Sequence, residues 1–461
     1  MRAARQSLGT GGFGVTIMKQ DISRRTFLKR AAATSVAGPL ILPRLSFASP
    51  ANSRLQHAAI GVGGQGAGDL GNIFSSDKVD VVALCDVDEN NLQRAAQTYP
   101  NARLYRDWRE MLDTEEKNID SVNIATPDHT HAPAAMTAIR KGKHVYCEKP
   151  LTHEVHEARK LRLAAHRQGV ATQMGNQIHA HEFYRTAVQW VHEGAIGKVK
   201  EWHSWSAAIF TTDDKKRPEG RDPIPPTLDW ELWIGTAPEC PYVEGAYHPF
   251  WWRRYRDFGG GAVGDFGCHI FDPVYSALGV GAPLSIMCEA ESVSDEVHPG
   301  WTIAYYEYPG TDMTAGKTIK ATWRDGGKQP DKGLSPHLPK DYAMPPSGSM
   351  LIGEDGTLVI PHVAEPQLHP IEKFQNYPKP ELEPRSHYHE FVEAALGNGV
   401  CGSNFDFAGP MAEAVLLANV ANRFPGQTLE WNDRWMRFTN FRDANKYLRR
   451  RYRVGHGVWG L

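Results

Sequence analysis

The stretch Gly61-Val62-Gly63-Gly64-Gln65-Gly66 decides the fold of this chain. It ends an apolar segment, residues 57–62, that predicts a strand, and it opens a segment with a helical pattern. A glycine-rich turn between a strand and a helix, with the spacing G-x-G-x-x-G, is typical of a dinucleotide-binding unit. The first glycine permits a tight turn, the second lets the backbone approach a pyrophosphate, and the third allows the helix to pack closely. The turn predicts a dinucleotide site built from Gly61, Gly63, Gly64, Gln65 and Gly66.

The chain around this turn alternates strand-like and helical segments from residue 56 to about residue 173. Strands joined by crossover helices form a parallel, doubly wound sheet. We therefore expect an α/β protein that begins with a Rossmann domain at residues 55–175. The predicted strands are residues 57–62, 79–85, 121–125, 144–147 and 170–174, and the helices between them include 132–140 and 153–168.

The second half of the chain predicts an α+β domain at residues 176–430 with an open, mostly antiparallel sheet. Segments 211–226 and 326–347 are rich in proline, glycine and charge and predict loops. The basic and aromatic residues 431–461 predict an arm that packs on the body of the protein or on a neighbouring copy. The predicted strands are 199–208, 285–291, 302–308, 318–323, 350–352 and 357–360, and the helices are 183–192, 262–277, 388–396 and 410–422.

The first 48 residues predict an export signal. The run Ser23–Lys29 holds a twin-arginine motif, an apolar segment follows at 31–42, and Ser46-Phe47-Ala48 matches a small-x-small cleavage site. Twelve apolar residues in a helix span about 18 Å, less than the roughly 30 Å of a membrane core. We expect cleavage near Ala48, delivery to the periplasm by the machinery that exports folded proteins, and no stable membrane anchor, with an uncleaved tether or a chance match to the motif as the alternatives. Met18 would start a signal of more usual length than Met1 does.

Composition excludes one class of partner and predicts the state of the cysteines. Without residues 1–48 the chain has 43 Lys or Arg and 52 Asp or Glu, a formal net charge of −9. A protein of this charge is a poor candidate for binding nucleic acid. The six cysteines could pair in an oxidising compartment, but export after folding in a reducing cytoplasm favours buried free thiols.

Asp86 predicts which dinucleotide binds. It lies 20 residues after Gly66, at the end of the second predicted strand. A carboxylate at this place accepts hydrogen bonds from the ribose hydroxyls of NAD and repels the 2′-phosphate of NADP. We therefore expect NAD rather than NADP, with an unrelated aspartate after a glycine-rich turn as the alternative.

Two polar motifs follow later strands of the same domain. Thr126-Pro127-Asp128-His129-Thr130-His131 and Glu148-Lys149-Pro150 both come after apolar segments. In an open parallel sheet, ligands bind beyond the carboxyl ends of the strands. Further along the chain, Gly259-Gly260-Gly261 precedes Asp265 and His269. Together with the glycine turn, these motifs resemble the Gfo/Idh/MocA family, that is, glucose–fructose oxidoreductase, inositol 2-dehydrogenase and their relatives.

The resemblance extends over residues 55–461 and implies a Rossmann domain, a substrate domain on an open sheet and a tightly bound nicotinamide cofactor. The motifs Met174-Gly175-Asn176-Gln177 and Asn404-Phe405-Asp406, with the export signal, resemble the secreted bacterial branch. An exposed sheet face often pairs in this family, so we expect a homo-oligomer. The resemblance places Lys149 beside the nicotinamide and the reacting carbon, and the residues that it places at the cofactor are Thr126, Pro127, His131, Glu148 and Lys149.

The catalytic residues expected on this basis are Lys149, Asp265 and His269. Asp265 and His269 are four residues apart and share one helix face. Removal of a hydride from a secondary alcohol needs a base, and His269 fits because the ordinary pKa of histidine is near neutral. Asp265 would bind a substrate hydroxyl or orient the base, and a Lys149 side chain desolvated beside a positive nicotinamide should have a lowered pKa. No third ligand accompanies the Asp-x-x-x-His spacing, so no metal is expected; helix packing and an ion pair between Lys149 and Glu148 are the structural alternatives.

The substrate side of the site is predicted from aromatic and polar residues. The stretch Tyr247–Arg256 is aromatic and basic, and Trp251 and Arg253 within it suit a polyol or an acidic sugar. Asn176 and His179 are expected to line the same pocket as Asp265 and His269. Core packing or an interface is the alternative for the aromatic stretch, and a structural role is the alternative for His179.

The leading functional hypothesis is NAD-dependent hydride transfer at a secondary hydroxyl of a sugar, polyol or sugar derivative. The second is a glycoside hydrolase that recycles its NAD through a transient 3-keto sugar, which would suit a compartment where free NAD is scarce. The third is a non-catalytic sugar or nucleotide sensor, against which Lys149 and His269 both argue. Net reduction of the cofactor would favour the first hypothesis, and release of an aglycone without net reduction would favour the second.

Overall fold

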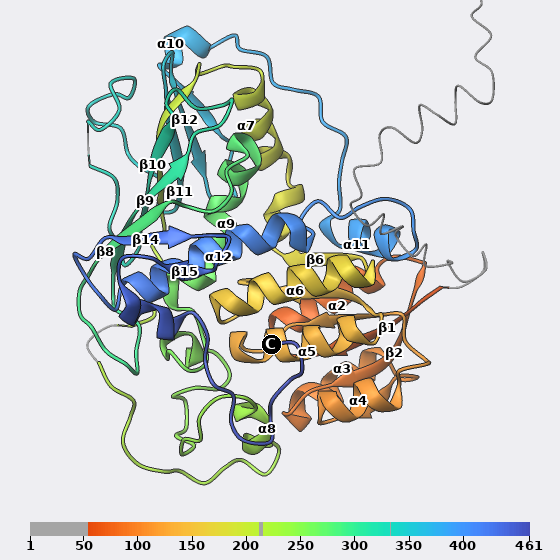
Figure 1. The fold of residues 1–461 in the computed structure, drawn as a ribbon. Helices are drawn as coiled ribbons and strands as arrows, with labels where there is room; N and C mark the ends of the chain where they lie inside the picture. The colour runs from red at the N-terminus through yellow and green to blue at the C-terminus, as the bar shows by residue number, and fades with distance from the viewer. Residues whose placement is uncertain (1–53, 212–214, 332) are drawn as a thin grey trace, which may run out of the picture. The chain divides into compact units, whose positions relative to one another are not determined.

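The computed structural model describes residues 54–211, 215–331 and 333–461 (Figure 1). The predicted export signal, residues 1–48, lies outside this part of the chain. The described residues form two sheets, one parallel and one mixed, joined by packed helices.

The N-terminal sheet has six strands in the order β3-β2-β1-β4-β5-β6, and all of its pairings are parallel. Its central strand β4 is buried along its whole length, and the neighbouring strands β1 and β5 are buried except at one residue each, as expected for a parallel sheet covered by helices. The order reverses between β1 and β4, where the carboxyl ends of the strands open a crevice for ligands. The strands are β1 (Leu55–Ile60), β2 (Val79–Cys85), β3 (Arg103–Tyr105), β4 (Ser121–Ile124), β5 (His144–Glu148) and β6 (Thr172–Gly175).

Five helices alternate with these strands, which confirms the predicted doubly wound α/β fold. Helix α5 starts at Asp128, four residues before the predicted start, because Pro127 sets the cap and an acidic residue suits the first turn of a helix. Pro133 inside α5 has no N–H, so the carbonyl of His129 accepts instead from the Thr236 hydroxyl. The helices are α2 (Gln65–Phe74), α3 (Glu89–Thr98), α4 (Trp108–Thr114), α5 (Asp128–Arg140) and α6 (Val155–Gln168).

The second sheet has nine strands in the order β13-β12-β11-β7-β10-β9-β8-β14-β15. Strands β7 and β10 pair in parallel and the other pairings are antiparallel, so the predicted open, mostly antiparallel sheet is confirmed. The strands are β7 (Val199–Trp205), β8 (Ser285–Ala290), β9 (Thr302–Pro309), β10 (Thr318–Arg324), β11 (Gly348–Gly353), β12 (Thr357–Pro361), β13 (Gln367–His369), β14 (Leu429–Asn432) and β15 (Arg437–Phe438).

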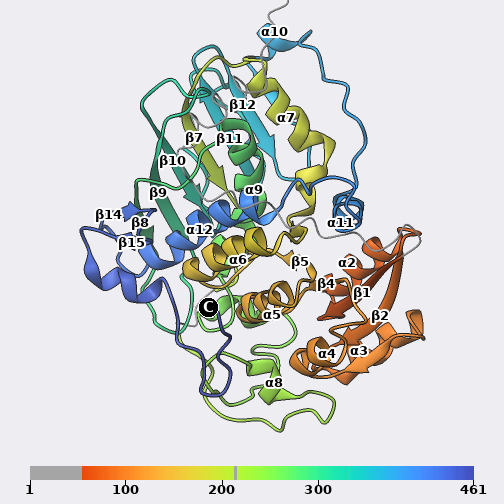
Figure 2. The same ribbon diagram turned by 45° about the vertical axis from the view of Figure 1, so that its right-hand side comes forward.

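Two long helices join the sheets. Helix α9 (Gly261–Leu278) packs on the second sheet, where Phe271 meets the edge of the fully buried Trp202 with ring centroids 4.7 Å apart. Helix α12 (Phe405–Ala421) packs on α9 and on α6 of the first domain (Figure 2). It starts five residues before the predicted Pro410, because the Asn404 side chain caps it by accepting from the next backbone N–H groups.

The remaining elements frame these layers. Helix α7 (Glu182–His192) packs on α9, and the long segment between β7 and α9 carries α8 (Trp230–Ile234) and the 3-10 helix η2 (Trp251–Arg254). An aromatic cluster built around Trp230, Trp233, Tyr247 and Phe258 holds that segment together. The other short elements are η1 (Gln177–Ala180), α10 (Ile371–Phe374), α11 (His387–Ala395) and η3 (Arg442–Tyr447).

The C-terminal residues return to the first domain, and the end of the chain lies beside α5 and α6 (Figures 1 and 2). The Arg140 guanidinium stacks on the Trp459 ring at 4.1 Å, and Arg450 lies 3.5 Å from a carboxylate oxygen of Glu157. The second half of the predicted arm therefore packs on the body of the same chain.

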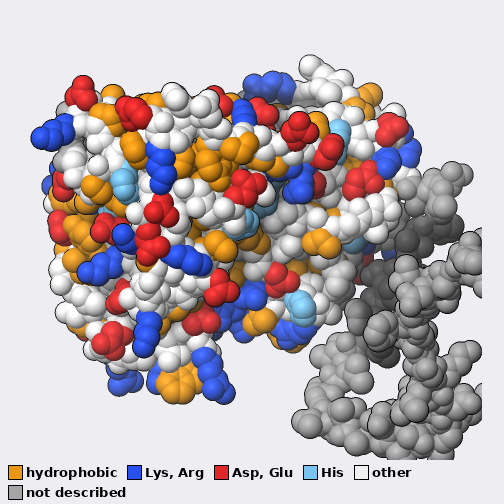
Figure 3. Space-filling model, turned by 90° about the horizontal axis from the view of Figure 1, so that it is seen from above, with side chains coloured by type: hydrophobic (Ala, Val, Ile, Leu, Met, Phe, Trp, Pro, Cys, Tyr) orange, Lys and Arg blue, Asp and Glu red, His pale blue; other side chains and the backbone are white. Residues whose placement is uncertain are grey.

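The distribution of surface charge and the state of the cysteines agree with what the composition predicts. Acidic and basic side chains are interspersed over the face shown in Figure 3. All six cysteines lie in the described part of the chain as free thiols; five are buried, as predicted, and Cys240 is half-buried. Within the described residues, no helix is both long and apolar enough to cross a membrane.

Candidate active site

A cavity of about 530 Å³ runs along the carboxyl ends of the parallel strands to the start of α9. It brings together residues that are far apart in the sequence, which is what the motif positions predicted. The predicted site residues that line it are Gly61, Gly63, Gly64, Gln65, Asp86, Thr126, Pro127, Glu148, Lys149, Arg253, Asp265 and His269. The predicted residues that do not line it are Gly66, His131, Asn176, His179 and Trp251.

The glycine turn has room for a dinucleotide pyrophosphate. Gly61 has φ +80°, and a Cβ there would lie 2.6 Å from the Ala125 carbonyl oxygen. Gly66 lies away from the cavity because it packs α2 on the turn: its Cβ would be 2.0 Å from the Gly61 oxygen. A Cβ on Gly64 would instead meet no atom within 4 Å, so this glycine faces open space at the uncapped start of α2. The N–H groups of a helix start bind phosphate, so the turn fits the diphosphate of NAD.

Asp86 lies where the ribose end of the cofactor is expected. Its carboxylate accepts the backbone N–H groups of Val62 and Asp88, each at 2.9 Å, and its side chain is largely buried. Burial raises the pKa of Asp86, and the two N–H donors partly offset this rise. A buried carboxylate pinned at the edge of the cavity supports the predicted exclusion of a 2′-phosphate.

Replacing Asp86 with serine should lower the affinity for NAD and weaken the discrimination against NADP. A hydrogen bond to a charged group contributes about 1.5–3 kcal/mol, so the ratio of the two dissociation constants should shift by about tenfold or more. Titration of purified protein with both nucleotides, followed by fluorescence, measures the ratio. Equal binding of NAD and NADP by the unmodified protein would refute the role given to Asp86.

Lys149 and Asp265 form a largely enclosed ion pair. Lys149 Nζ lies 2.6 Å from Asp265 Oδ1, and Arg253 Nε lies 3.0 Å from the same oxygen. Burial alone would raise the pKa of Asp265, but the two cations lower it to about 2. Burial alone would lower the pKa of Lys149, but Asp265 and Glu148 outweigh it and the pKa is raised. The sequence-based expectation of a lowered Lys149 pKa is therefore wrong for the protein alone, because a partner 116 residues away holds the ammonium form.

His269 lies in the same cavity as a neutral imidazole. Burial is the main reason that its pKa lies well below the ordinary value, and Lys149 and His362 lower it further. Its Nδ1 has no hydrogen-bond partner among the described residues. The near-neutral pKa expected from the sequence is wrong, but the lowered pKa keeps the imidazole neutral throughout the neutral pH range, in the form that can accept a proton.

Asn176 and His179 do not line the cavity, but they bind a side chain of helix α9. Both bind the buried carboxylate of Asp272, three residues after His269 on α9: His179 Nδ1 lies 2.9 Å from it, and the Asn176 amide donates to it. The Ser403 hydroxyl donates to the Asn176 carbonyl oxygen at 2.5 Å. Burial opposes a charge on His179, but Asp272 outweighs it and raises the pKa of His179. These contacts fix α9 instead of lining the cavity.

Two further residues that the sequence analysis assigned to the site, His131 and Trp251, do not line the cavity. His131 Nε2 donates to the Thr126 carbonyl oxygen at 2.8 Å, so His131 stabilises the turn at Thr126 and Pro127. The Trp251 side chain is 43% exposed and lies under the Arg254 guanidinium. Its neighbours Phe250 and Trp252 line the cavity instead, with the Arg253 guanidinium over both rings.

Sequence reasoning missed part of the lining. Asp128 lies within the Thr126–His131 motif, but its position in that motif predicts no role. The aromatic stretch 247–256 was a usable signal for His248, Phe250 and Trp252, whereas nothing local marks Trp233, which the aromatic cluster orients. The lining residues without a predicted role include Asn91, Arg94, Arg106, Trp108, Asp128, Thr130, Gln177, Leu232, Trp233, His248, Phe250 and Trp252.

Comparison with known proteins agrees with this geometry. Residues 55–176 match the family described as "Oxidoreductase family, NAD-binding Rossmann fold", and residues 199–325 match its "C-terminal alpha/beta domain". The chain belongs to the Gfo/Idh/MocA oxidoreductase family. Together the two matches account for more than half of the 461 residues and include the glycine turn, Lys149 and Asp265.

Members of the family with curated names match the chain over a short part of their length. A glycosyl hydrolase family 109 protein of Stenotrophomonas maltophilia is 37% identical over 141 residues, 28% of this chain and 29% of that protein. D-apiose dehydrogenase of Paraburkholderia graminis is 33% identical over 148 residues, 31% of this chain and 38% of that protein. The WlbA dehydrogenase of Bordetella pertussis, solved with NADH and UDP-GlcNAcA, has the same fold with a TM-score of 0.58 and 16% identity, over 82% of this chain and 99% of that one.

Proposed function

We propose that this Gfo/Idh/MocA protein is an NAD-dependent oxidoreductase that transfers a hydride at a secondary hydroxyl of a sugar, polyol or sugar derivative. One observation carries the proposal: Lys149, Asp265 and His269 line the same cavity as the glycine turn. The turn fits a dinucleotide, and the same cavity also offers a proton donor, a proton acceptor and aromatic faces. The name D-apiose dehydrogenase of a relative supports a sugar as the substrate class.

The residues of the cavity divide the proton chemistry between them. NAD, when bound, supplies the acceptor of the hydride. Neutral His269 takes the proton of the substrate hydroxyl, and in the reverse direction the Lys149 ammonium donates a hydrogen bond to the carbonyl oxygen. Asp265 stays ionised and holds Lys149 and Arg253 in place. Phe250 and Trp252 provide flat apolar faces of the kind that pack on sugar rings.

A redox-neutral glycoside hydrolase is the second candidate. The match with a glycosyl hydrolase family 109 protein at 37% identity favours it over a non-catalytic sensor. In this reaction, oxidation at C3 acidifies the C2 proton, elimination releases the leaving group, water adds, and reduction at C3 returns the hydride. The same residues would serve, because a base, an ammonium donor and a bound dinucleotide are needed in both reactions.

One experiment separates the two candidates. The purified protein is denatured to identify any nucleotide that copurifies, and the intact protein is then mixed with a panel of sugars and glycosides. Accumulation of reduced nicotinamide with a keto sugar supports the oxidoreductase. Release of a free aglycone with no net reduction supports the hydrolase, and neither signal with any carbohydrate argues against both.

We further propose that the protein is exported through the twin-arginine route and cleaved near Ala48. The motif Arg24-Arg25, the short apolar run and the small-x-small site support this proposal. Replacing both arginines with lysine should leave the precursor in the cytoplasm, which fractionation and mass spectrometry would detect. An intact N-terminus on protein recovered from the periplasm would contradict the cleavage.

A further inference from the structure

We propose that Asp128 is a positioning residue whose carboxylate ties the glycine turn at the start of α9 to the Rossmann half of the active site. The inference rests on the proposed function, because its purpose is to place Asp265 and His269 against the cofactor. Asp128 is buried, is the first residue of α5, and lines the cavity. Its Oδ2 accepts the N–H of Gly260 at 2.9 Å.

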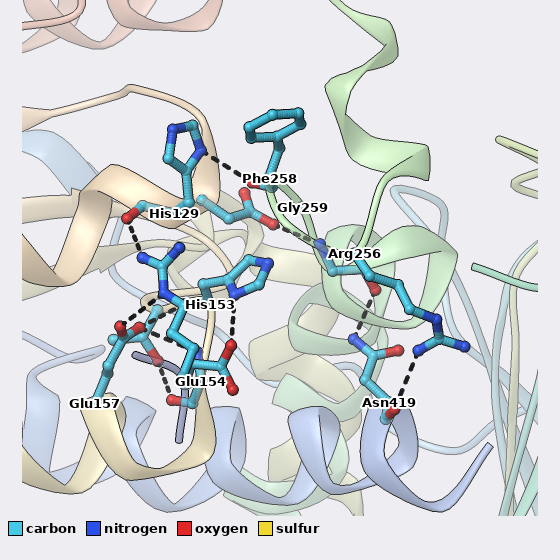
Figure 4. Close-up of polar contacts among 12 residues, drawn as sticks. His129, His153, Glu154, Glu157, Arg256, Phe258, Gly259 and Asn419 are labelled. Carbon is cyan, nitrogen blue, oxygen red and sulfur yellow. Dashed lines mark hydrogen bonds and ion pairs between the residues drawn. The ribbon is translucent and has the colours of Figure 1, made fainter. Parts of the chain in front are cut away.

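The glycine turn at the start of α9, residues 258–261, is anchored from several elements (Figure 4). The backbone N–H of His129 donates to the Phe258 carbonyl at 3.2 Å, and Asn419 Nδ2 of α12 donates to the Gly260 carbonyl at 2.8 Å. His298 Nε2 donates to the Gly259 carbonyl at 2.8 Å. The Gly260 N–H is the point at which the turn is held by a charged side chain.

The turn has little freedom to adopt another shape. Gly261 has φ +62°, and a Cβ on it would lie 2.7 Å from the His298 ring. A Cβ on Gly260 would lie 2.9 Å from the Gly264 backbone. Because α9 starts at Gly261, a shift of this turn moves Asp265 in the second turn of the helix, and the ion pair of Asp265 with Lys149 moves with it.

The surroundings give Asp128 a different charge state from Asp265. Burial raises the pKa of Asp128 to about 7, and the negative Asp265 adds to the rise. The cations that face Asp128 are Lys149, Arg253 and, when protonated, His153; they lower its pKa but do not cancel the effect of burial. Two carboxyl groups whose pKa values are pushed apart in one site are typical of divided roles. Asp265 stays ionised, while the hydrogen bond from the Gly260 N–H to Asp128 weakens when the Asp128 carboxylate is protonated.

The neutral anchors of the same turn provide controls. Burial lowers the pKa of His129 to about 3 and places that of His298 well below its ordinary value, and Asn419 carries no charge. Asn419→Ala therefore removes one anchor without removing a titrating group.

The test compares Asp128→Asn, which keeps the size and one acceptor oxygen, with Asn419→Ala. The unmodified enzyme should gain kcat as the pH rises through about 7, and Asp128→Asn should lose this rise. A misplacement of about 1 Å costs up to about 100-fold in rate, so Asp128→Asn should lower kcat at about pH 8 by about 10- to 100-fold with little change in KM. Asn419→Ala should lower kcat by a similar factor at every pH. Retention of the pH-dependent rise by Asp128→Asn, or its loss in Asn419→Ala, would overturn the proposal.

A second readout needs no substrate and therefore separates this proposal from failure of the proposed function. The folded pKa of Asp128 lies above its unfolded value of 3.8, so the folded state loses stability as the pH rises from about 4 to about 7. Asp128→Asn removes that loss, and its Tm relative to the unmodified protein should rise between about pH 5 and pH 8. A Tm that falls equally at both pH values would show that Asp128 only stabilises the fold.

Discussion

Replacing Lys149 with alanine should lower kcat by about 10²–10⁴-fold, or roughly 3–5 kcal/mol of barrier, with little change in the affinity for NAD. The Lys149 ammonium is held 2.6 Å from Asp265 of α9 and is not part of the glycine turn, so we expect it to act on the reacting atoms rather than on the diphosphate. Stopped-flow turnover and nucleotide fluorescence titration measure the two quantities separately. The alanine variant leaves Asp265 paired with Arg253, so the carboxylate is not stranded without a cation.

Lys143→Ala is the matched control for this variant. Lys143 lies just before β5, whereas Lys149 lies just after it, and Lys143 donates to the Ile119 carbonyl at 2.8 Å. Its loss should affect stability and leave the chemical step alone. If a folded, NAD-loaded Lys149→Ala protein turns over as fast as Lys143→Ala, then Lys149 takes no part in the reaction.

Replacing His269 with alanine should also lower kcat by about 10²–10⁴-fold. Because its pKa lies well below the ordinary value, His269 stays neutral throughout the neutral range, and the loss should be the same factor at each pH. The kcat–pH profile of the variant, measured on protein shown to be folded by thermal denaturation, tests this expectation. Lys149 and His269 serve one proton transfer, so the double variant should be little worse than either single variant.

His362→Ala is a close control for His269→Ala. The two rings lie 5.7 Å apart, but His362 bonds to the Tyr184 hydroxyl at 3.0 Å and does not line the cavity. The His362 variant should therefore lose less activity than the His269 variant. Near-normal turnover of a folded His269→Ala protein would move the role of base to another residue.

Local patterns predicted the parts of the fold that depend on neighbours in the sequence. The glycine turn, the parallel strands and the shared helix face of Asp265 and His269 all follow from spacing over a few residues. The starts of α5 and α12 lie earlier than the pattern predicts because the prolines at 133 and 410 obscure the helical periodicity. Each helix tolerates its proline, and capping at Pro127 and Asn404 sets where it begins.

Properties that depend on distant partners were not predictable from spacing. The charge state of Lys149 is set by Asp265, which is 116 residues away, and that of His269 by burial under several elements. Asn176 was expected in the pocket, but its amide binds Asp272, 96 residues away, and no local pattern reveals that pair. Trp251 and Trp252 are adjacent in the sequence, and only the turn of η2 decides which ring faces the cavity.

Transfer of a labelled hydride is the decisive test of the chemistry at this site. The purified, NAD-loaded protein is mixed for a single turnover with a sugar that carries deuterium on the carbon of its reacting secondary hydroxyl. The reaction is quenched, and the nucleotide is analysed by mass spectrometry. We expect deuterium on the nicotinamide with the unmodified protein and far less with Lys149→Ala and His269→Ala. Formation of a keto sugar without deuterium on the nicotinamide would contradict hydride transfer to NAD in this cavity.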